Sequence, residues 1–149
     1  MLTNKGKYGL KAMLFLARQP EGATAAGQDI AVANGIPKKF LDAILLELRN
    51  AGMVRTRKGP GGGYALAKPL TEIRVGHIIR VLDGPLAPIN CASKSAYMPC
   101  ADCRNVEGCS VRITMSKVRD AMSDILDRMS LKDMIVFAEH PDSDFMYQI

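Results

Sequence analysis

The stretch 37–67 reads PKKFLDAILLELRNAGMVRTRKGPGGGYALA, and its pattern decides the fold. Its first half, up to Arg49, repeats apolar residues at the three-and-four spacing of one helix face. Its second half alternates apolar and polar residues over 53–57 and again over 64–67, on either side of the glycine-rich segment 58–63. The stretch therefore predicts a helix followed by a two-stranded β-hairpin with a long turn.

Two shorter helical patterns precede this stretch. Residues 5–18 carry apolar side chains on one face, and residues 28–34 form a second short helix that ends at a glycine-containing turn. Two helices joined by such a turn form a helix-turn-helix, in which the second helix lies in the major groove of DNA. The outward side chains of that second helix are then Lys38, Lys39, Asp42 and Arg49. The alternative is that the two lysines are ordinary surface residues.

The turn of the hairpin has an unusual composition, with four glycines around Pro60. Because glycine has no side chain, the backbone there can approach a DNA groove or a phosphate closely. Positive charge and bare backbone together predict a DNA-contacting wing, whose contact residues are Arg55, Arg57, Lys58, Gly59, Gly61 and Gly62. A nucleotide-binding loop is disfavoured, because the spacing and the following helix of a phosphate-binding loop are missing.

Charge is divided unevenly along the chain. The 149 residues carry a formal charge of +5, and residues 1–68 hold eleven Lys and Arg against four Asp and Glu. Residues 69–149 hold nine against eleven. A basic, patterned half favours a nucleic-acid partner, with a solvated basic face as the alternative. The sequence has no signal-peptide pattern and no apolar run near the ~20 residues of a membrane span, so we expect a cytoplasmic protein.

All four cysteines lie in one short stretch: Cys91, Cys100, Cys103 and Cys109. The gaps between them are of eight, two and five residues, in a segment containing Pro, Gly, Ser and Asn that predicts a loop. Thiolates converge stably only around something positive and soft, so a metal site is one interpretation. Two disulfides are the other, and they would need an oxidising compartment. In the expected cytoplasm we predict reduced or metal-bound thiols, with all four cysteines as candidate ligands.

The C-terminal half is predicted to be helical. A helix over 73–83 follows the hairpin, and a longer one begins after the cysteines. The apolar positions of the longer helix follow the heptad spacing of a helix-helix seam: Val111, Met115, Val118, Met122, Ile125 and Met129. This seam favours a symmetric dimer, with packing on the chain's own N-terminal part as the alternative. A capping-box pattern at 130–133 opens a short helix over 131–138, and the tail beyond it is expected to be flexible.

Several segments of the chain resemble one family. MLTNKGKY at 1–8, KGPGGGY at 58–64, EIRV at 72–75 and SLKDM at 130–134 are similar to the Rrf2 family of winged-helix transcription regulators, which includes the iron-sulfur regulators IscR, NsrR and RirA. The resemblance implies a homodimer with two recognition helices in successive major grooves of an operator and two wings in flanking minor grooves. Carried over by position, the resemblance implies that the recognition helix contacts DNA through Pro37, Lys38, Lys39 and Asp42. At the wing it implies a contact from Lys58.

The resemblance also implies an iron-sulfur cluster, because three cysteines of this loop hold the cluster in the cluster-binding members. Cys91 occupies the usual position, and Cys103 and Cys109 keep the usual five-residue gap. The loop between Cys91 and Cys103 is longer, however, and Cys100 is additional. Four thiols would suffice for a two-iron or a four-iron cluster. Zinc in a four-cysteine site and a thiol switch at Cys100 and Cys103 are the alternatives.

These expectations define four segments: a winged helix-turn-helix over 1–83, a cysteine-rich sensor loop over 84–109, a dimerisation helix with a short C-terminal helix over 110–140, and a flexible tail over 141–149. The predicted fold is mainly α with a small β-hairpin wing. The predicted function is a dimeric, sequence-specific DNA-binding regulator, a repressor controlled by a cluster, and not an enzyme. The alternative is the same regulator answering to zinc, thiol oxidation or a small organic ligand. A thiol-disulfide enzyme using Cys100 and Cys103 is disfavoured, because no βαβ pattern surrounds them.

Overall fold

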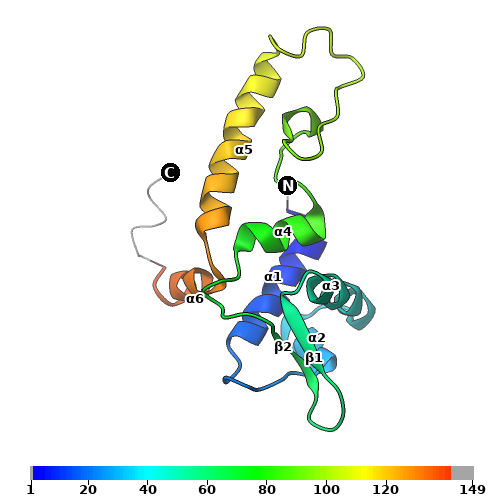
Figure 1. Cartoon of the computed structure of the whole chain (residues 1–149), viewed down its shortest axis with the longest axis vertical. Coiled ribbons are helices and arrows are strands. Elements are labelled where there is room, and N and C mark those ends of the chain that lie inside the picture. Colours follow the sequence, from blue (N-terminus) through cyan, green and yellow to red (C-terminus); the bar gives the residue numbers. More distant parts are fainter. Residues whose placement is uncertain (1, 142–149) are drawn as a thin grey trace.

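The structure is a computed structural model that describes residues 2–141. It is mainly α-helical with one antiparallel hairpin, as the sequence predicted (Figure 1). In chain order the elements are α1 (Asn4–Ala17), α2 (Gly27–Asn34), α3 (Lys38–Asn50), β1 (Val54–Arg57), β2 (Gly63–Leu66), α4 (Val75–Asp83), the 3-10 turn η1 (Asn90–Ala92), α5 (Ser110–Arg128) and α6 (Leu131–Glu139). Apart from residue 141, the tail predicted to be flexible lies outside the described residues.

The apolar core lies where α1, α3 and α4 meet. Met13 of α1 and Ile78 of α4 are fully covered there. α1 and α4 approach so closely that a Cβ at Gly9 would lie 2.0 Å from a methyl carbon of Leu82, so a larger residue there would displace the end of the Leu82 side chain. The predicted core face of α3 is confirmed, because its buried residues are Leu41, Ile44, Leu45 and Leu48.

α2 and α3 form the helix-turn-helix (Figure 1). α2 ends at Gly35, whose φ of 62° is a left-handed conformation that glycine adopts without strain. The chain then buries Ile36 and enters α3 through Pro37, whose ψ of 129° keeps it outside the helix. Since one face of α3 is buried against the core, its opposite face points away from the protein and is exposed.

The wing is the hairpin of β1 and β2, joined by the turn 58–62. Val54 pairs with Leu66 at the base, and Arg57 pairs with Gly63 next to the turn. Tyr64 also exchanges two backbone hydrogen bonds, of 2.8 and 2.9 Å, with Ala25 in the segment before α2. The hairpin is therefore fixed to the helix-turn-helix by backbone hydrogen bonds rather than projecting freely.

α5 extends away from the winged-helix part as one long helix (Figure 1). It begins at Ser110, with Cys109 as its N-cap residue, and none of its 19 residues is fully buried. The loop that carries the cysteines runs alongside it, from the end of α4 to the far end of α5 (Figure 1). The longest helix of the described chain is thus the one least covered by its own protein.

α6 folds back onto the winged-helix part, where it packs against α1. Leu131 at its start is fully buried, and its N–H donates to the carbonyl of Ile73 at 3.1 Å. The predicted capping box is confirmed: the Ser130 hydroxyl accepts from the Asp133 N–H, and the Asp133 carboxylate accepts from the Ser130 N–H at 2.7 Å. These hydrogen bonds lower the pKa of the Asp133 carboxyl.

Candidate DNA-binding surface and cysteine loop

The residues predicted to contact DNA from α3 lie together at its start. All four of them are exposed: Pro37, Lys38, Lys39 and Asp42. The Lys38 ammonium lies 2.6 Å from the Asp42 carboxylate, one helical turn further on. Lys39 forms no ion pair with any residue between 2 and 141. Considering residues 2–141, the start of α3 therefore offers one lysine without an ion pair, Lys39, and one internal ion pair to a partner.

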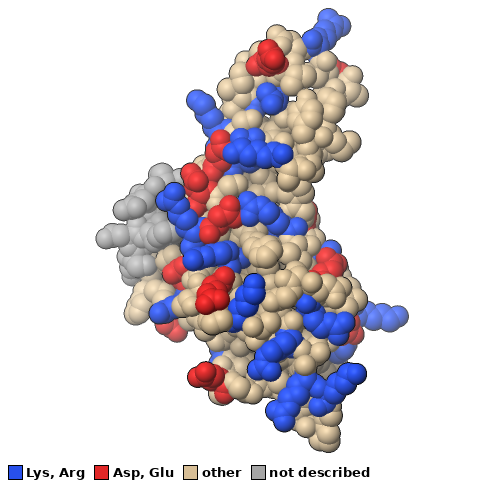
Figure 2. All heavy atoms as spheres, in the orientation of Figure 1, with Lys and Arg blue, Asp and Glu red and all other residues tan. Residues whose placement is uncertain are grey.

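The predicted contact residues of the wing lie on the hairpin and its turn, where Arg55, Arg57 and Lys58 are exposed. Gly59 and Gly61 have φ of 91° and 72°, conformations that favour glycine. Glycine is required at Gly62 as well, because a Cβ there would lie 2.2 Å from a backbone carbonyl oxygen. Figure 2 shows mainly Lys and Arg over the end of the molecule where the wing lies. The turn thus combines positive charge with backbone that a partner can approach.

The wing and the helix-turn-helix form one continuous surface. The Thr24 hydroxyl donates to the carbonyl of Gly61 at 2.7 Å, which holds the turn against the segment before α2. A Cβ at Gly27 would lie 3.3 Å from the Lys38 side chain and 3.4 Å from the Tyr64 ring, so both side chains lie over the start of α2. Sequence reasoning assigned no role to Thr24, and it placed Tyr64 only in the second strand and in the wing motif. The aromatic residue directly after a glycine-rich turn was the available signal.

The four cysteines are placed unequally. Cys91 lies in η1 and is buried, whereas Cys100 is exposed, and their sulfur atoms are 3.8 Å apart. Cys103 and Cys109 are half-buried. Within the described part of the chain no three Cys, His, Asp or Glu side chains are gathered as a metal-ligand set. Of the predicted ligands, the structure thus brings only Cys91 and Cys100 together.

The thiol of Cys100 is influenced mainly by its neighbour. A hydrogen bond to Cys91, followed by the charge of Cys91, raises the pKa of the Cys100 thiol, with smaller contributions from burial and from Asp102 and Cys103. This shift favours the protonated form of the Cys100 thiol. A bound cation would act in the opposite direction, because thiolates are the form that binds metals.

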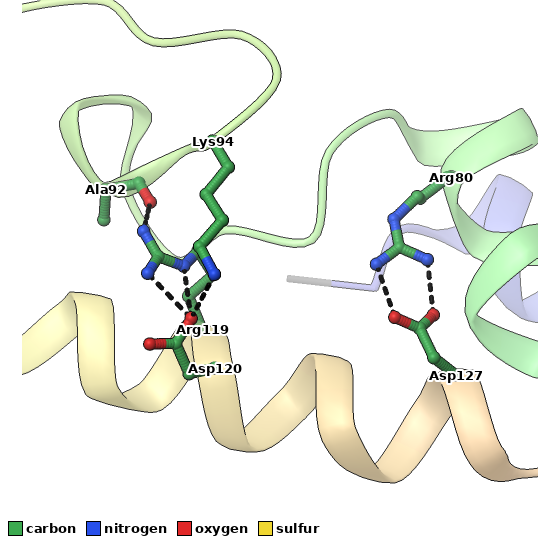
Figure 3. Close-up of polar contacts among 6 residues, drawn as sticks. All are labelled: Arg80, Ala92, Lys94, Arg119, Asp120 and Asp127. Carbon is green, nitrogen blue, oxygen red and sulfur yellow. Dashed lines mark hydrogen bonds and ion pairs between the residues drawn. The ribbon is translucent and has the colours of Figure 1, made fainter.

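Two arginines of α5, Arg112 and Arg119, attach η1 to that helix, and we call them the arginine clamp. Arg112 Nε donates to the carbonyl of Cys91 at 2.9 Å. Arg119 donates to the carbonyl of Ala92 (Figure 3). The two arginines are seven residues apart, about two helical turns, so they share one face of α5. That shared face was a signal in the sequence. The partners of the arginines, being backbone carbonyls of a loop, gave none.

Ion pairs reinforce the attachment of the loop. The Asp120 carboxylate accepts from Arg119 at 2.7 Å and pairs with Lys94 of the loop at 3.1 Å (Figure 3). Hydrogen bonds from Arg119 and then from Lys94 lower the pKa of the Asp120 carboxyl. The loop is therefore held to α5 by backbone carbonyls and by one shared carboxylate.

A further ion pair connects α5 to the winged-helix part. Arg80 near the end of α4 binds the Asp127 carboxylate through its two terminal guanidinium nitrogens, and Nη2 lies 3.0 Å from Oδ2 (Figure 3). The hydrogen bond to Arg80 lowers the pKa of Asp127, and the pKa of Arg80 is raised in turn. Contacts thus connect η1, which carries Cys91, through α5 to α4.

A cavity of about 310 Å³ lies between α4, the cysteine loop and α5. Its walls include Ile79, Leu86, Met98 and Met122, with Asn90 as one of its polar lining residues. The cavity could accept a small molecule that carries both apolar and polar groups. Its position beside the cysteine loop makes it relevant to the predicted alternative of an organic ligand.

Comparison with known proteins identifies one family. The family described as "Rrf2: Iron-dependent Transcriptional regulator" matches residues 2–136. An rrf2-like HTH-type transcriptional regulator of Rhodobacter capsulatus is 40% identical over 140 residues, covering 91% of this chain and 92% of that protein. The HTH-type transcriptional regulator CymR of Bacillus subtilis is 30% identical over 148 residues, covering 99% of each chain.

Solved structures agree with the sequence matches. The structure of CymR, described as the global cysteine regulator of B. subtilis, superimposes with a TM-score of 0.75 at 31% identity and covers 92% of this chain and 97% of that one. The IscR structure from T. potens gives a TM-score of 0.74 at 30% identity and covers 95% and 90%. Among residues 2–141, no helix has the length and apolar character needed to cross a membrane.

Proposed function

The chain belongs to the Rrf2 family of DNA-binding transcriptional regulators, and we propose that it acts in the cytoplasm as a homodimeric repressor whose DNA affinity is set by an iron-sulfur cluster on the cysteine loop. The family and the winged-helix neighbours confirm that the chain is a regulator rather than an enzyme. The dimer, the cluster and the direction of regulation are the proposed parts.

DNA contact is assigned to the start of α3 and to the wing. Lys39 lies on the exposed face of α3 and would bind a phosphate or a base edge, and Asp42 would accept a hydrogen bond from a cytosine amine. Lys58, beside glycines that leave the backbone open, would enter a narrow and electronegative minor groove. This assignment is supported by the contacts of Tyr64 and Thr24, which orient the wing and the helix-turn-helix as one surface.

Dimerisation is assigned to α5, because its apolar side chains lack cover. Val111 is 62% exposed and Val118 is 40% exposed, and the helix buries no residue fully. A second copy of α5 would remove these side chains from water, which apolar surface favours. Met129, also part of the predicted seam, is instead the residue after the helix and packs against the core of its own chain. Of the seam positions, Val111 and Val118 are the exposed ones that a second copy would cover.

The donor set of the cysteine loop fits an iron-sulfur cluster. Such clusters are held by cysteine thiolates, and when bound they add a centre that responds to iron supply and to oxidation. Cys91 and Cys100 would form the first pair of ligands, since their sulfur atoms are already adjacent. Cys103 and Cys109 would complete the site, and to do so the loop has to bring them toward that pair.

The arginine clamp is the observation that carries the proposed regulation. Because Arg112 and Arg119 bind the carbonyls of Cys91 and Ala92, a rearrangement of the cysteines acts directly on α5. α5 in turn holds α4 through Asp127. In a dimer built on α5, a small shift would change the spacing of the two recognition helices, to which half-site binding is sensitive.

A second candidate function keeps the DNA-binding part but takes a small organic ligand, rather than an iron-sulfur cluster, as the signal. The relative CymR is described as a global cysteine regulator, and the cavity of about 310 Å³ next to the cysteine loop could accept a small organic molecule. Binding there would also act on α4 and α5, because both line the cavity through Ile79 and Met122. This candidate needs no metal at the cysteines.

Anaerobic purification followed by visible absorption and by iron, sulfide and zinc analysis separates these candidates. The proposal expects a coloured protein with iron and sulfide, and loss of both on replacing Cys91 or Cys100 by Ser. Ser95→Ala, at an exposed position of the same loop, serves as the matched control and should keep the cluster. DNA binding is then measured with and without the cluster. A colourless zinc protein, or equal DNA affinity in both forms, would contradict cluster control while leaving DNA binding intact.

A further inference from the structure

The exposed face of α3 has an apolar centre. Lys39, Ala43, Leu46 and Asn50 follow one another at helical spacing and are all exposed, opposite the stripe that the helix buries in the core. Leu46 is 48% exposed, although the neighbouring Leu45 is fully buried. Two of the four positions at the middle of this face thus present only methyl and methylene groups.

Several polar side chains on the flanks of this strip are engaged within the chain, whereas the exposed Arg49 forms no ion pair with any residue between 2 and 141. On one flank Lys38 pairs with Asp42 at 2.6 Å, and on the other Glu47 pairs with Lys5 at 2.7 Å. The flanks are therefore partly neutralised, and hydrogen-bonding groups are drawn away from the middle of the face. A ligand that meets the centre of α3 finds an apolar surface there.

In the major groove of DNA, only thymine presents a methyl group; the other base edges present hydrogen-bond donors and acceptors. We infer that Ala43 and Leu46 read thymine C5-methyl groups, so that each half-site of the operator carries thymines opposite the middle of α3. DNA is the occupant that the charge favours, because residues 1–68 carry eleven Lys and Arg against four Asp and Glu. The inference rests on the proposed docking of α3 in the major groove.

Deoxyuridine provides a direct test, because it differs from thymidine only by the missing C5-methyl group. The full-length protein, purified anaerobically, is used to select a preferred duplex from a random pool. Each thymine of the selected site is then replaced by deoxyuridine, and the dissociation constant is measured by fluorescence anisotropy at fixed salt. At one or two thymines per half-site we expect binding about fourfold weaker, the factor that corresponds to ~0.8 kcal/mol for one buried methylene-sized group.

Two variants at one position identify the reader. Leu46→Ser should bind the thymine duplex more weakly and lose its sensitivity to deoxyuridine at one position, whereas Leu46→Met, which keeps an apolar side chain, should retain that sensitivity. Because Leu46 is exposed, neither variant should alter the thermal unfolding followed by circular dichroism. A selected site without any deoxyuridine effect, or an unchanged profile in Leu46→Ser, would overturn the inference while DNA binding stands. Failure to select any sequence would overturn both.

Discussion

The winged-helix part and α5 are stabilised by different interactions. In the winged-helix part Leu41, Leu45 and Ile78 are completely covered. In α5 no residue is fully buried, and its neighbours are bound by hydrogen bonds from the arginine clamp and by the ion pair of Asp127 with Arg80. One region is held by apolar burial, and the other mainly by polar contacts near the solvent.

This difference suits the two regions to different tasks. Burying a large apolar side chain stabilises a fold by ~1.5–3 kcal/mol, whereas an exposed ion pair contributes ~0–1 kcal/mol. The winged-helix part can therefore keep the geometry of α3 and the wing unchanged. α5 and the cysteine loop can rearrange at low cost, which the proposed sensing and dimerisation require.

The largest effect is expected in the core. Leu45→Ala should lower the free energy of unfolding by about 2–5 kcal/mol, because it leaves a cavity in a fully buried site. Leu46→Ala, at the next residue on the exposed face, is the control and should change stability by no more than about 0.5 kcal/mol. Urea denaturation followed by circular dichroism measures both. Equal losses in the two variants would contradict the assignment of the buried face.

The dimer seam comes second. Val118→Asp places a carboxylate in the proposed contact between the two α5 helices. The dissociation constant of the dimer should therefore rise about hundredfold, which corresponds to a loss of ~2.7 kcal/mol in the free energy of dimerisation. Lys117→Asp changes the adjacent exposed residue and should leave the dimer intact. Analytical ultracentrifugation gives the mass of each variant. A mass for Val118→Asp equal to that of the unmodified chain would remove this face of α5 from the interface.

A smaller effect is expected from removing one hydrogen bond of the arginine clamp. Arg119→Ala removes a hydrogen bond to the carbonyl of Ala92. The amides of η1 should then exchange with solvent about tenfold faster, the factor that corresponds to a loss of ~1.5 kcal/mol for one hydrogen bond. The DNA affinity should also become less sensitive to the state of the cysteines. Hydrogen exchange by mass spectrometry and anisotropy follow the two effects. Lys117→Ala should change neither, and normal regulation in Arg119→Ala would show that the clamp is only structural.

The start of α6 supplies a pH-dependent term. Hydrogen bonds from Ser130 hold the pKa of the folded Asp133 carboxyl below the ~3.9 of an unfolded aspartate. The stabilisation is therefore complete above about pH 4 and is lost as the pH falls through the lower folded pKa. Ser130→Ala should cost about 1 kcal/mol at neutral pH and flatten this acid dependence.

Ser110→Ala is the control for the capping residue. Ser110 opens α5 without a side-chain cap at that end of the helix, so the change should be small. Denaturation curves between pH 3 and pH 7 compare the two serine variants, a range that spans the ~3.9 reference value. A loss as large in Ser110→Ala as in Ser130→Ala would mean that capping is not the cause.

The smallest effect is expected at the wing. Lys58→Ala should weaken operator binding a few-fold and lower the slope of log affinity against log salt by about one, because one phosphate contact is lost. Lys132→Ala on α6, away from the wing, should keep the slope. Anisotropy titrations at several salt concentrations measure both. An unchanged slope for Lys58→Ala would exclude this lysine from the interface.

The features that the sequence predicted depend on neighbours a few positions away. The buried stripe from Leu41 to Leu48, the hairpin and the capping box at Ser130 follow from periodicity, turn chemistry and local hydrogen bonds. The arginine clamp joins Arg112 to Cys91 across 21 residues, and Arg80 meets Asp127 across 47. No local pattern records such partners, because they are set by how the elements pack.

The same limit applies to α5 and α6. The heptad pattern correctly indicated a long helix after Cys109, but not that Met129 would end against the core of its own chain. The short helix α6 packs on α1, a partner that the capping-box pattern did not indicate. Apolar spacing specifies which face of a helix seeks cover. It does not specify what supplies the cover.

The sequence by itself determined the winged helix-turn-helix, the glycine wing and the presence of four thiols in one loop, since each is a property of contiguous residues. Only the tertiary structure shows that Cys91 and Cys100 are adjacent, that Arg112 and Arg119 bind the turn that carries Cys91, and that Leu46 lies 48% exposed on the outward face of α3. The physical reason is that hydrogen-bond partners and solvent exposure are fixed by packing between distant segments, which no short stretch of sequence contains.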